Sequence, residues 1–125
     1  MTVDVSNSPN LILTCDVDFF DLATEELFAA AADAEIVATV EDGVMAIYVP
    51  NGFVDLAERW RKAPPIFVRH ICPVNVIAPL RASRDDLYAI RDAAKPLADV
   101  LDPDLPFSVQ TRIFGELPYK PFDIN

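Results

Sequence analysis

Over the first third of the chain, short apolar runs typical of strands alternate with segments in which apolar residues recur at helical spacing. Leu11–Cys15 is a run of strand-forming residues and predicts a strand. Residues 22–32 are rich in Leu, Ala and Glu and hold no Gly or Pro, which predicts a helix with Asp21 as its N-cap. The apolar spacing predicts a buried stripe on this helix made of Leu22, Ala23, Leu27, Ala30 and Ala31.

A hairpin and a second helix follow in the pattern. Residues 36–40 and 44–49 are apolar runs joined by Asp42-Gly43, and this dipeptide tolerates the positive φ angles that a tight two-residue turn needs. Apolar residues then recur at helical spacing from Phe53 to Trp60, and we expect Trp60 to be buried against the sheet. Pro64-Pro65 ends this helix, because proline offers no N–H and restricts the residue before it.

The last extended run of the first part covers residues 66–80, where prolines mark an edge, a bulge or an end. The predicted order over residues 11–80 is therefore β-α-β-β-α-β, the ferredoxin-like split βαβ arrangement, after a tail at 1–10. A helix is expected from Ser83, its N-cap, to Val100, kinked or divided at Pro96. Residues 107–114 alternate as a half-exposed strand. The predicted fold class is α+β.

Composition limits the class of protein. The chain has 125 residues, 52% of them hydrophobic, which is enough apolar material for a folded domain. No apolar run approaches the roughly 20 residues that span a membrane, and residues 1–10 hold no Lys or Arg as a signal peptide would. We therefore expect a soluble, cytoplasmic protein that does not enter membranes. Its three glycines fit neither a dinucleotide-binding loop nor a P-loop.

Charge divides the chain into two halves that the net charge of −10 conceals. Residues 1–58 hold twelve Asp or Glu and no Lys or Arg, whereas residues 59–125 hold all ten basic residues and eight acidic ones. The acidic total disfavours nucleic-acid binding by the chain as a whole. A polarised chain can still bind a polyanion on its basic side, so net charge alone does not decide the matter.

Three groups of residues are candidate chemical sites. Asp16, Asp18 and Asp21 lack the glycine and glutamate of a calcium loop, so a solvated turn with a helix cap is the better interpretation. Cys15 and Cys72 fall on strands that neighbour each other in the predicted fold, yet in a reducing compartment they are expected to act as small hydrophobic residues. His70 and Cys72 share a strand face without an evident third group, so the sequence predicts neither a catalytic nor a metal site.

The basic residues are the remaining candidates. Alternation places Arg69 on the strand face away from Phe67, and it places Arg112 among polar and aromatic groups that suit a sheet contacting sugar and phosphate. Ordinary solvated charge is the competing interpretation. The residues expected to contact backbone phosphates are Arg69, Arg81, Arg84, Arg112 and Lys120.

Two segments also carry a family resemblance. These are Pro65–Val74 and Pro106–Arg112, the latter continued by Tyr119–Asn125. They resemble the N-terminal region of bacterial SAM-dependent RNA 2′-O-ribose methyltransferases of the FtsJ-related type, in which a ferredoxin-like unit leads into a THUMP RNA-binding domain. The matching residues are Phe67, Arg69 and Val74 in a strand that closes the first unit, and Pro106, Phe107, Val109 and Arg112 in a strand that opens the second. Residues 11–27 also fit the family's opening strand and helix, although Asp16-Val17-Asp18 replaces the family's Pro-Gly.

The resemblance implies a ferredoxin-like domain at 11–80 and the start of a truncated THUMP-like unit at 81–125. It implies a region that positions structured RNA, such as rRNA, for a methyltransferase domain absent from this chain. The glycine-rich SAM loop and the catalytic lysines are missing, so the chain alone is expected to bind no cofactor and to transfer no methyl group. Two alternatives stay open: a protein-interaction or homo-oligomerisation module that pairs strand 107–114 with another chain, and a ligand-binding regulatory domain.

Overall fold

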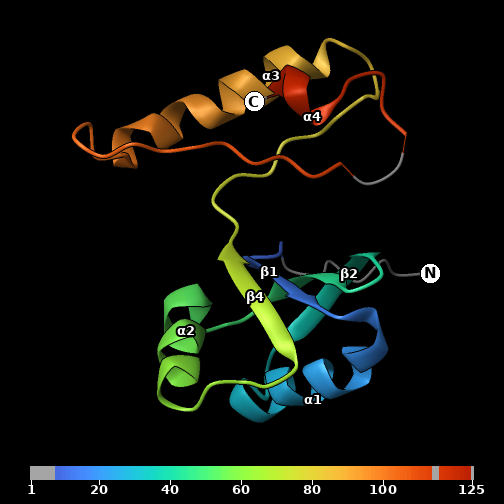
Figure 1. Cartoon of the computed structure of the whole chain (residues 1–125), viewed down its shortest axis with the longest axis vertical. Helices are drawn as coiled ribbons and strands as arrows, with labels where there is room; N and C mark the ends of the chain where they lie inside the picture. Colours follow the sequence, from blue (N-terminus) through green and yellow to red (C-terminus); the bar gives the residue numbers. More distant parts are fainter. Residues whose placement is uncertain (1–7, 114–115, 125) are drawn as a thin grey trace. The chain divides into compact units, whose positions relative to one another are not determined.

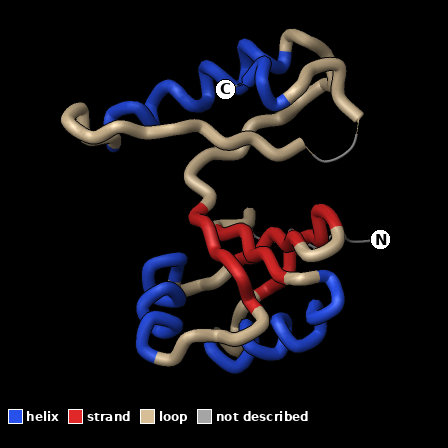
Figure 2. The backbone as a smooth tube through the Cα atoms, in the orientation of Figure 1, coloured by secondary structure: helices blue, strands red, loops and turns tan. Residues whose placement is uncertain are grey.

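The computed structural model describes residues 8–113 and 116–124 of the chain. They belong to two compact units, which we call unit 1 (Met1–Val74) and unit 2 (Asn75–Asn125) and describe separately. All four strands lie in unit 1, whereas unit 2 consists of helices and irregular segments (Figure 2). The predicted α+β class is confirmed at this level, with one antiparallel sheet and four α-helices in the described residues.

Unit 1 is built on a four-stranded sheet with the order β2-β3-β1-β4 (Figure 1). Its strands are β1 (Leu11–Cys15), β2 (Glu35–Glu41), β3 (Val44–Tyr48) and β4 (Val68–Pro73), and every neighbouring pair is antiparallel. In this register Leu13 lies opposite Met45 on one side and Ile71 on the other. β1 therefore lies inside the sheet between β3 and β4, and β4, the last strand along the chain, forms one edge.

Two helices supply the apolar layer for one face of this sheet. α1 (Phe20–Ala30) buries Ala23 and Leu27, and α2 (Gly52–Lys62) buries Leu56 and Trp60. The predicted burial of Trp60 is confirmed at 8% exposure. Leu22 is a correction to the predicted stripe, because its side chain is 40% exposed. The core cluster consists of Leu11, Leu13, Cys15, Ala23, Leu27, Met45, Ile47, Val49, Leu56, Trp60 and Val68.

The start of the first helix differs from the prediction. A 3₁₀ turn, η1 (Val17–Phe19), precedes α1, and the Asp16 carboxylate accepts a hydrogen bond from the main-chain amide of Asp18 at 3.0 Å. Asp21 is not the N-cap, since it lies inside the first turn of α1. Asp16 caps the 3₁₀ turn, whereas Phe19, the N-cap residue of α1, makes no side-chain hydrogen bond to the helix.

The hairpin between β2 and β3 is tight, as predicted, but only one of its two residues has a positive φ. Gly43 has φ +81°, whereas Asp42 is not among the described residues with positive φ. A Cβ atom at Gly43 would lie 2.5 Å from the carbonyl oxygen of Cys15, so a side chain does not fit there. The main-chain amide of Cys15 in turn donates to the carbonyl of Gly43 at 2.9 Å. Glycine is thus required both by the turn and by the close approach of β1.

The entry to β4 is held by a carboxylate from α1. Glu26 accepts hydrogen bonds from the main-chain amides of Ile66, Phe67 at 2.8 Å and Val68 at 3.0 Å. The strand then ends at Pro73, seven residues short of the predicted extended run 66–80. Pro73 has no N–H, and the last ladder-like bond is the one from Val74 to the carbonyl of Asn10 at 3.0 Å.

Unit 2 contains α3 (Asp86–Ala94), the 3₁₀ helix η2 (Lys95–Val100) and the short α4 (Pro121–Ile124). Pro96 lies at the start of η2, so the predicted division of the long helix is confirmed. Ser83 is not its N-cap, because α3 begins three residues later. The reason is the Asp86 carboxylate, which itself binds the amides of the preceding turn.

The predicted strand 107–114 is wrong for the residues that the structure describes. Residues 107–113 have no regular secondary structure, and Phe114 lies outside the described residues. Phe107 and Val109 are 67% and 52% exposed. Alternation makes a strand only where a neighbouring strand pairs with it, and no strand of the sheet does so here.

Candidate functional site

The turn that precedes α3 is organised around one buried carboxylate. Asp86 accepts hydrogen bonds from the main-chain amides of Arg81 at 2.8 Å and Ser83 at 3.3 Å, and from the Tyr119 hydroxyl at 2.9 Å. Ala82, between the two amides, has φ +59°, the left-handed conformation that turns successive amides toward one anion. This carboxylate therefore fixes the position of the first turn of α3 and connects it to the segment before α4.

The same contacts shift two pKa values in opposite directions. The hydrogen bond from the Arg81 amide is the main cause that lowers the pKa of Asp86, and it outweighs the effect of burial. Burial raises the pKa of Tyr119, and the hydrogen bond to the Asp86 carboxylate raises it further. Asp86 is thus held ionised and Tyr119 neutral, as the hydrogen bond between them requires.

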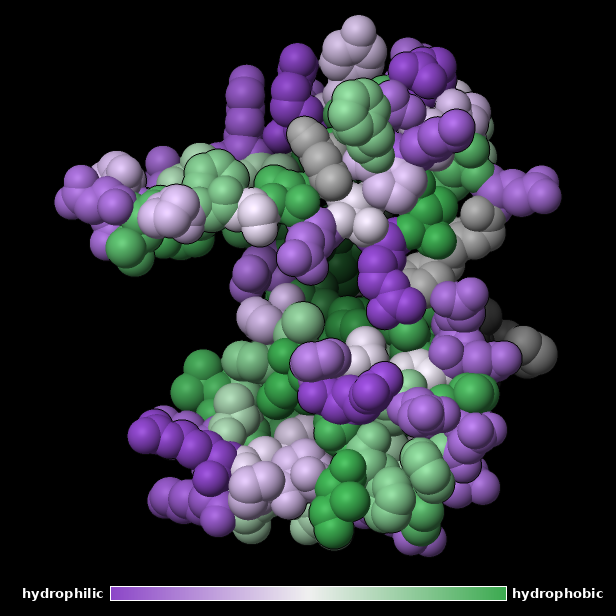
Figure 3. Space-filling model, in the orientation of Figure 1, coloured by the Kyte–Doolittle hydropathy of each residue, from purple (hydrophilic) through white to green (hydrophobic). Residues whose placement is uncertain are grey.

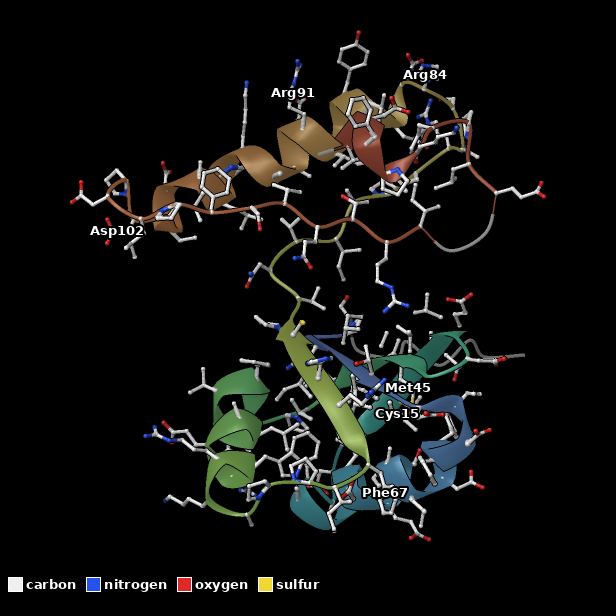
Figure 4. All side chains as sticks on the ribbon, in the orientation of Figure 1. Cys15, Met45, Phe67, Arg84, Arg91 and Asp102 are labelled. Carbon is white, nitrogen blue, oxygen red and sulfur yellow. The ribbon has the colours of Figure 1, made fainter. Side chains whose placement is uncertain are left out.

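A row of basic and aromatic side chains extends from this turn along α3. Arg84, Tyr88, Arg91 and Lys95 are spaced four, three and four residues apart, the spacing of residues on one side of a helix. We call them the α3 row. Tyr88 and Arg91 lie in α3, whereas Arg84 lies in the turn before it and Lys95 begins η2. In Figure 3 long hydrophilic side chains project from the α3–η2 segment, and Figure 4 labels Arg84 and Arg91 among them. The row is a cationic surface interrupted by one aromatic ring.

The charged members of the α3 row are weakly engaged. The guanidinium carbon of Arg91 lies 5.3 Å from the centre of the Tyr88 ring, a cation–π distance, and Tyr88 is 61% exposed. Arg91 also forms a 3.6 Å ion pair with Asp92, but both side chains are more than 60% exposed, so the pair contributes little. Arg84 donates a long, exposed hydrogen bond at 3.4 Å to the carbonyl oxygen of Pro118. Within the described residues no carboxylate forms an ion pair with Arg84 or Lys95.

The α3 row borders a groove of about 780 Å³ that lies entirely within unit 2. All four members of the row line it, and two carboxylates, Asp85 and Asp123, line it as well. The remaining wall is apolar and consists of Leu87, Ile90, Ala94, Val109 and Ile124. Three cations, one exposed ring and an apolar wall suit a ligand that joins negative charge to a flat apolar group.

The predicted phosphate-binding residues are dispersed. Arg84 lines the groove, whereas Arg69 lies on β4 in unit 1, where the register shifts between Thr14 and Cys15. Arg81 and Lys120 are exposed, and their main-chain amides bind Asp86 and Asp123 respectively. Arg112 is exposed in the irregular segment, not on a strand face as expected.

Three residues of the groove were missed by the sequence prediction: Tyr88, Arg91 and Lys95. Their spacing with Arg84 is visible in the sequence, because cations and an aromatic residue recur at helical intervals. The same helix also carries apolar residues at helical spacing, among them Leu87 and Ile90, and this stripe alone is enough to predict the helix. Residues that recur at helical spacing on the side opposite the apolar stripe can therefore reveal a surface site.

The cysteines do not approach each other along the sheet. Cys15 is buried opposite Val68, while Cys72 is exposed opposite Ile12, and both are free thiols. Burial raises the pKa of Cys15, and the negative charge of Asp16 adds to the shift. A protonated, buried thiol behaves as a small apolar side chain, in agreement with the prediction for Cys15. The same prediction is wrong for Cys72, whose side chain is exposed.

The described residues contain no group of three or more His, Cys, Asp or Glu that could hold a metal ion. Nor does any helix in the described ranges have the length and apolarity needed to cross a membrane. No family model matches this chain, and no curated protein or solved structure matches it either.

Proposed function

We propose that this chain is an RNA-binding module and that its contact surface is the α3 row. One observation carries the proposal: three cations and an exposed tyrosine border a groove with an apolar wall. Arginine and lysine bind phosphate oxygens, and a tyrosine ring between them offers a surface for a base. The earlier expectation of phosphate contacts is kept for Arg84 and extended to Arg91 and Lys95.

The charge balance makes the proposed contact local and weak. Unit 1 carries sixteen charged residues with a net charge of −8, and unit 2 carries fourteen with a net charge of −2. Neither unit therefore attracts a polyanion over a long range. Binding depends on phosphates that come within a Debye length of the row, about 8 Å at physiological salt, where the three cations exceed the two carboxylates of the groove. We expect modest affinity with a steep dependence on salt.

The proposed wider context is that of the family resemblance. The order β2-β3-β1-β4 with two helices supports a ferredoxin-like split βαβ unit, and the helical unit 2 would then occupy the place of the THUMP-like unit. In this proposal the module works in the cytoplasm and positions RNA, such as rRNA, for a SAM-dependent methyltransferase domain elsewhere. The methyltransferase context rests on the resembling segments alone, Pro65–Val74 and Pro106–Arg112.

A second candidate function has its own observation. Leu105, Phe107 and Val109 are each more than half exposed, and such side chains favour association with another apolar surface. If residues 107–113 pair with another chain, the chain is an interaction or homo-oligomerisation module. The mass in solution, measured by sedimentation, distinguishes a monomeric RNA-binding module from this alternative.

The test is a salt titration with a labelled RNA hairpin that carries a single-stranded tail. The double variant Arg84→Ala/Lys95→Ala should weaken binding and flatten the slope of log affinity against log salt by about one to two units, because each lost phosphate contact removes about 0.7–0.9. The matched control is Arg61→Ala/Lys62→Ala, which removes two exposed cations from α2 in unit 1.

The control should keep the slope of the parent protein. Equal losses in both double variants would mean that any surface cation contributes and that the α3 row is not the site. Absence of binding by the parent protein at about 50 mM salt would refute the RNA-binding proposal itself.

A further inference from the structure

We infer that the α3 row recognises unpaired nucleotides, with a base stacked on Tyr88 and the flanking phosphates bound by Arg84 and Lys95. This inference rests on the proposed RNA-binding function and deepens it, because it names the part of an RNA that is bound. It predicts a preference for a single strand over a duplex. The observations that carry it are the exposure of one ring, the cation over that ring, and the cations at either end of the row, which form no ion pair within the described residues.

Tyr88 differs from the other tyrosine of unit 2. Tyr119 is 4% exposed and donates its hydroxyl to Asp86, so its ring and its polar group are both engaged in holding the fold. Tyr88 is 61% exposed on the outer side of a helix, where a polar residue would be the usual choice. An exposed tyrosine that no structural role occupies is available for a ligand.

Arg91 makes this ring a better stacking surface. Its guanidinium group lies over the ring, with the guanidinium carbon 5.3 Å from the ring centre, and adds a second flat, positively charged surface to it. Bases stack on aromatic rings and on guanidinium planes alike, with little dependence on sequence. The pair Tyr88–Arg91 therefore offers a base two adjoining surfaces and discriminates little between the four bases.

The two ends of the row provide contacts for phosphates. Arg84 lies in the turn before α3 and Lys95 is the first residue of η2, so the two cations flank α3, whose nine residues span about 13 Å. Neither forms an ion pair within the described residues. A few nucleotides of an extended strand match this span, whereas a rigid duplex cannot place a base on the ring because its bases are stacked on one another.

The apolar wall of the groove also favours an unpaired base. A base that leaves its own stack exposes two apolar faces to water, and Leu87, Ile90 and Val109 line the groove beside the ring. The carboxylates Asp85 and Asp123 line the groove too and repel additional phosphate. The groove thus favours a base at its centre and phosphates at its ends.

The test compares three labelled RNAs of equal charge: a single strand of about twelve adenylates, an abasic strand of the same length, and a blunt hairpin. The parent protein should bind the adenylate strand about tenfold more tightly than the abasic strand, which is within the range for one stacked base. The hairpin should bind no better than the abasic strand. Adenosine monophosphate should fail to compete at concentrations where the strand saturates, since it lacks the second phosphate contact.

The decisive variants are Tyr88→Leu and Tyr88→Phe. Tyr88→Leu should lose the preference for the adenylate strand, and Tyr88→Phe should keep it because the ring remains. The matched control Phe107→Leu removes another exposed aromatic ring of unit 2, outside the groove, and should leave the preference unchanged. Tyr88 is exposed, so its replacement should not unfold α3, which far-UV circular dichroism checks.

The outcomes separate this inference from the proposed function. Equal binding of adenylate and abasic strands by the parent protein, or an unchanged preference in Tyr88→Leu, overturns the stacking inference. If Arg84→Ala/Lys95→Ala then still weakens binding, the RNA-binding proposal stands without it. If the parent protein binds none of the three RNAs at low salt, the RNA-binding proposal fails, and the inference fails with it.

Discussion

Unit 1 and unit 2 are stabilised by different kinds of contact. Every buried residue of the core cluster belongs to unit 1, and all of them are apolar or weakly polar. In unit 2 only two described residues are buried, Asp86 and Tyr119, and they bind each other through a hydrogen bond. The stability of unit 1 therefore depends on the area of apolar surface removed from water, and the stability of unit 2 depends on the hydrogen bonds around one carboxylate.

The difference has a consequence for where a ligand binds. Helices α1 and α2 of unit 1 use their apolar sides for the sheet, and Arg59 of α2 donates a hydrogen bond at 2.7 Å to the carbonyl of Ala30 at the end of α1. α3 of unit 2 buries only Asp86 and leaves Arg91 and Tyr88 exposed. The less densely packed unit is therefore the one with side chains available for recognition.

The largest effect is expected from the core of unit 1. Trp60→Ala should lower the free energy of unfolding by about 3–5 kcal/mol, because a large ring is removed from a site where it is 8% exposed. Urea unfolding followed by circular dichroism measures it. The matched control is Val54→Ala on the same helix, at a position 67% exposed, which should change stability by no more than about 0.5 kcal/mol. Comparable losses in both variants would contradict an apolar core centred on Trp60.

An intermediate effect is expected from pH in unit 2. The folded state lowers the pKa of Asp86, so native unit 2 binds fewer protons than the unfolded chain near pH 4. The stabilisation is therefore present above the ordinary aspartate pKa of about 3.9 and is lost as pH falls through the lowered value. For Tyr119, whose pKa is raised, stabilisation is present below about pH 10 and is lost as pH rises through the raised value.

NMR titration of the amides of Arg81 and Ser83 measures the acid step, because both donate to the Asp86 carboxylate. Asp86→Asn should remove this step. The control Asp85→Asn, at the exposed neighbouring position, should keep it. A step that persists in Asp86→Asn would show that another group titrates and that unit 2 is not organised around this carboxylate.

The smallest effect is expected at the turn beside Asp86. Ala82 has φ +59°, a conformation that costs a residue with a Cβ atom about 1–2 kcal/mol. Ala82→Gly relieves this cost but gives the unfolded chain more freedom, so we expect a net gain of about 1 kcal/mol or less. Chemical denaturation of the variant measures the gain, and Ala98→Gly, in η2 without a positive φ, should instead be destabilising. A loss at both positions would argue against strain in this turn.

Much of unit 1 was predictable because the spacing of its hydrophobic residues and the position of its turn residues indicate the same element boundaries. Pro64-Pro65 and the Asp42-Gly43 hairpin divide the chain where the structure divides it, and the burial of Trp60 followed from helical spacing alone. The positions of caps were less predictable, since Asp16 and Asp86 act on amides that only the folded turn presents to them. Local propensity ranks candidates for a cap but does not say which turn precedes the helix.

The remaining wrong or missing predictions concern residues whose contacts come from distant parts of the chain. Alternation in residues 107–113 is compatible with a strand, but pattern alone does not supply the neighbour that a strand requires. Glu26 counted among twelve acidic residues of the first half, yet it binds three amides forty or more residues away. The candidate site was partly predictable, because the spacing of the α3 row is local, whereas the groove beside it also needs Val109 and Ile124 from distant segments.

The position of β4 beside β1 has a consequence for synthesis of the protein. β1 can pair with β3 as soon as residue 48 has left the ribosome, but its other edge has no partner until residues 68–73 emerge. For that interval a nascent chain presents the unpaired edge of its most apolar strand. α1 is already complete by then and carries Glu26, whose carboxylate binds the residues that lead into β4. A carboxylate within α1 can therefore guide the late strand to the open edge before another nascent chain reaches it.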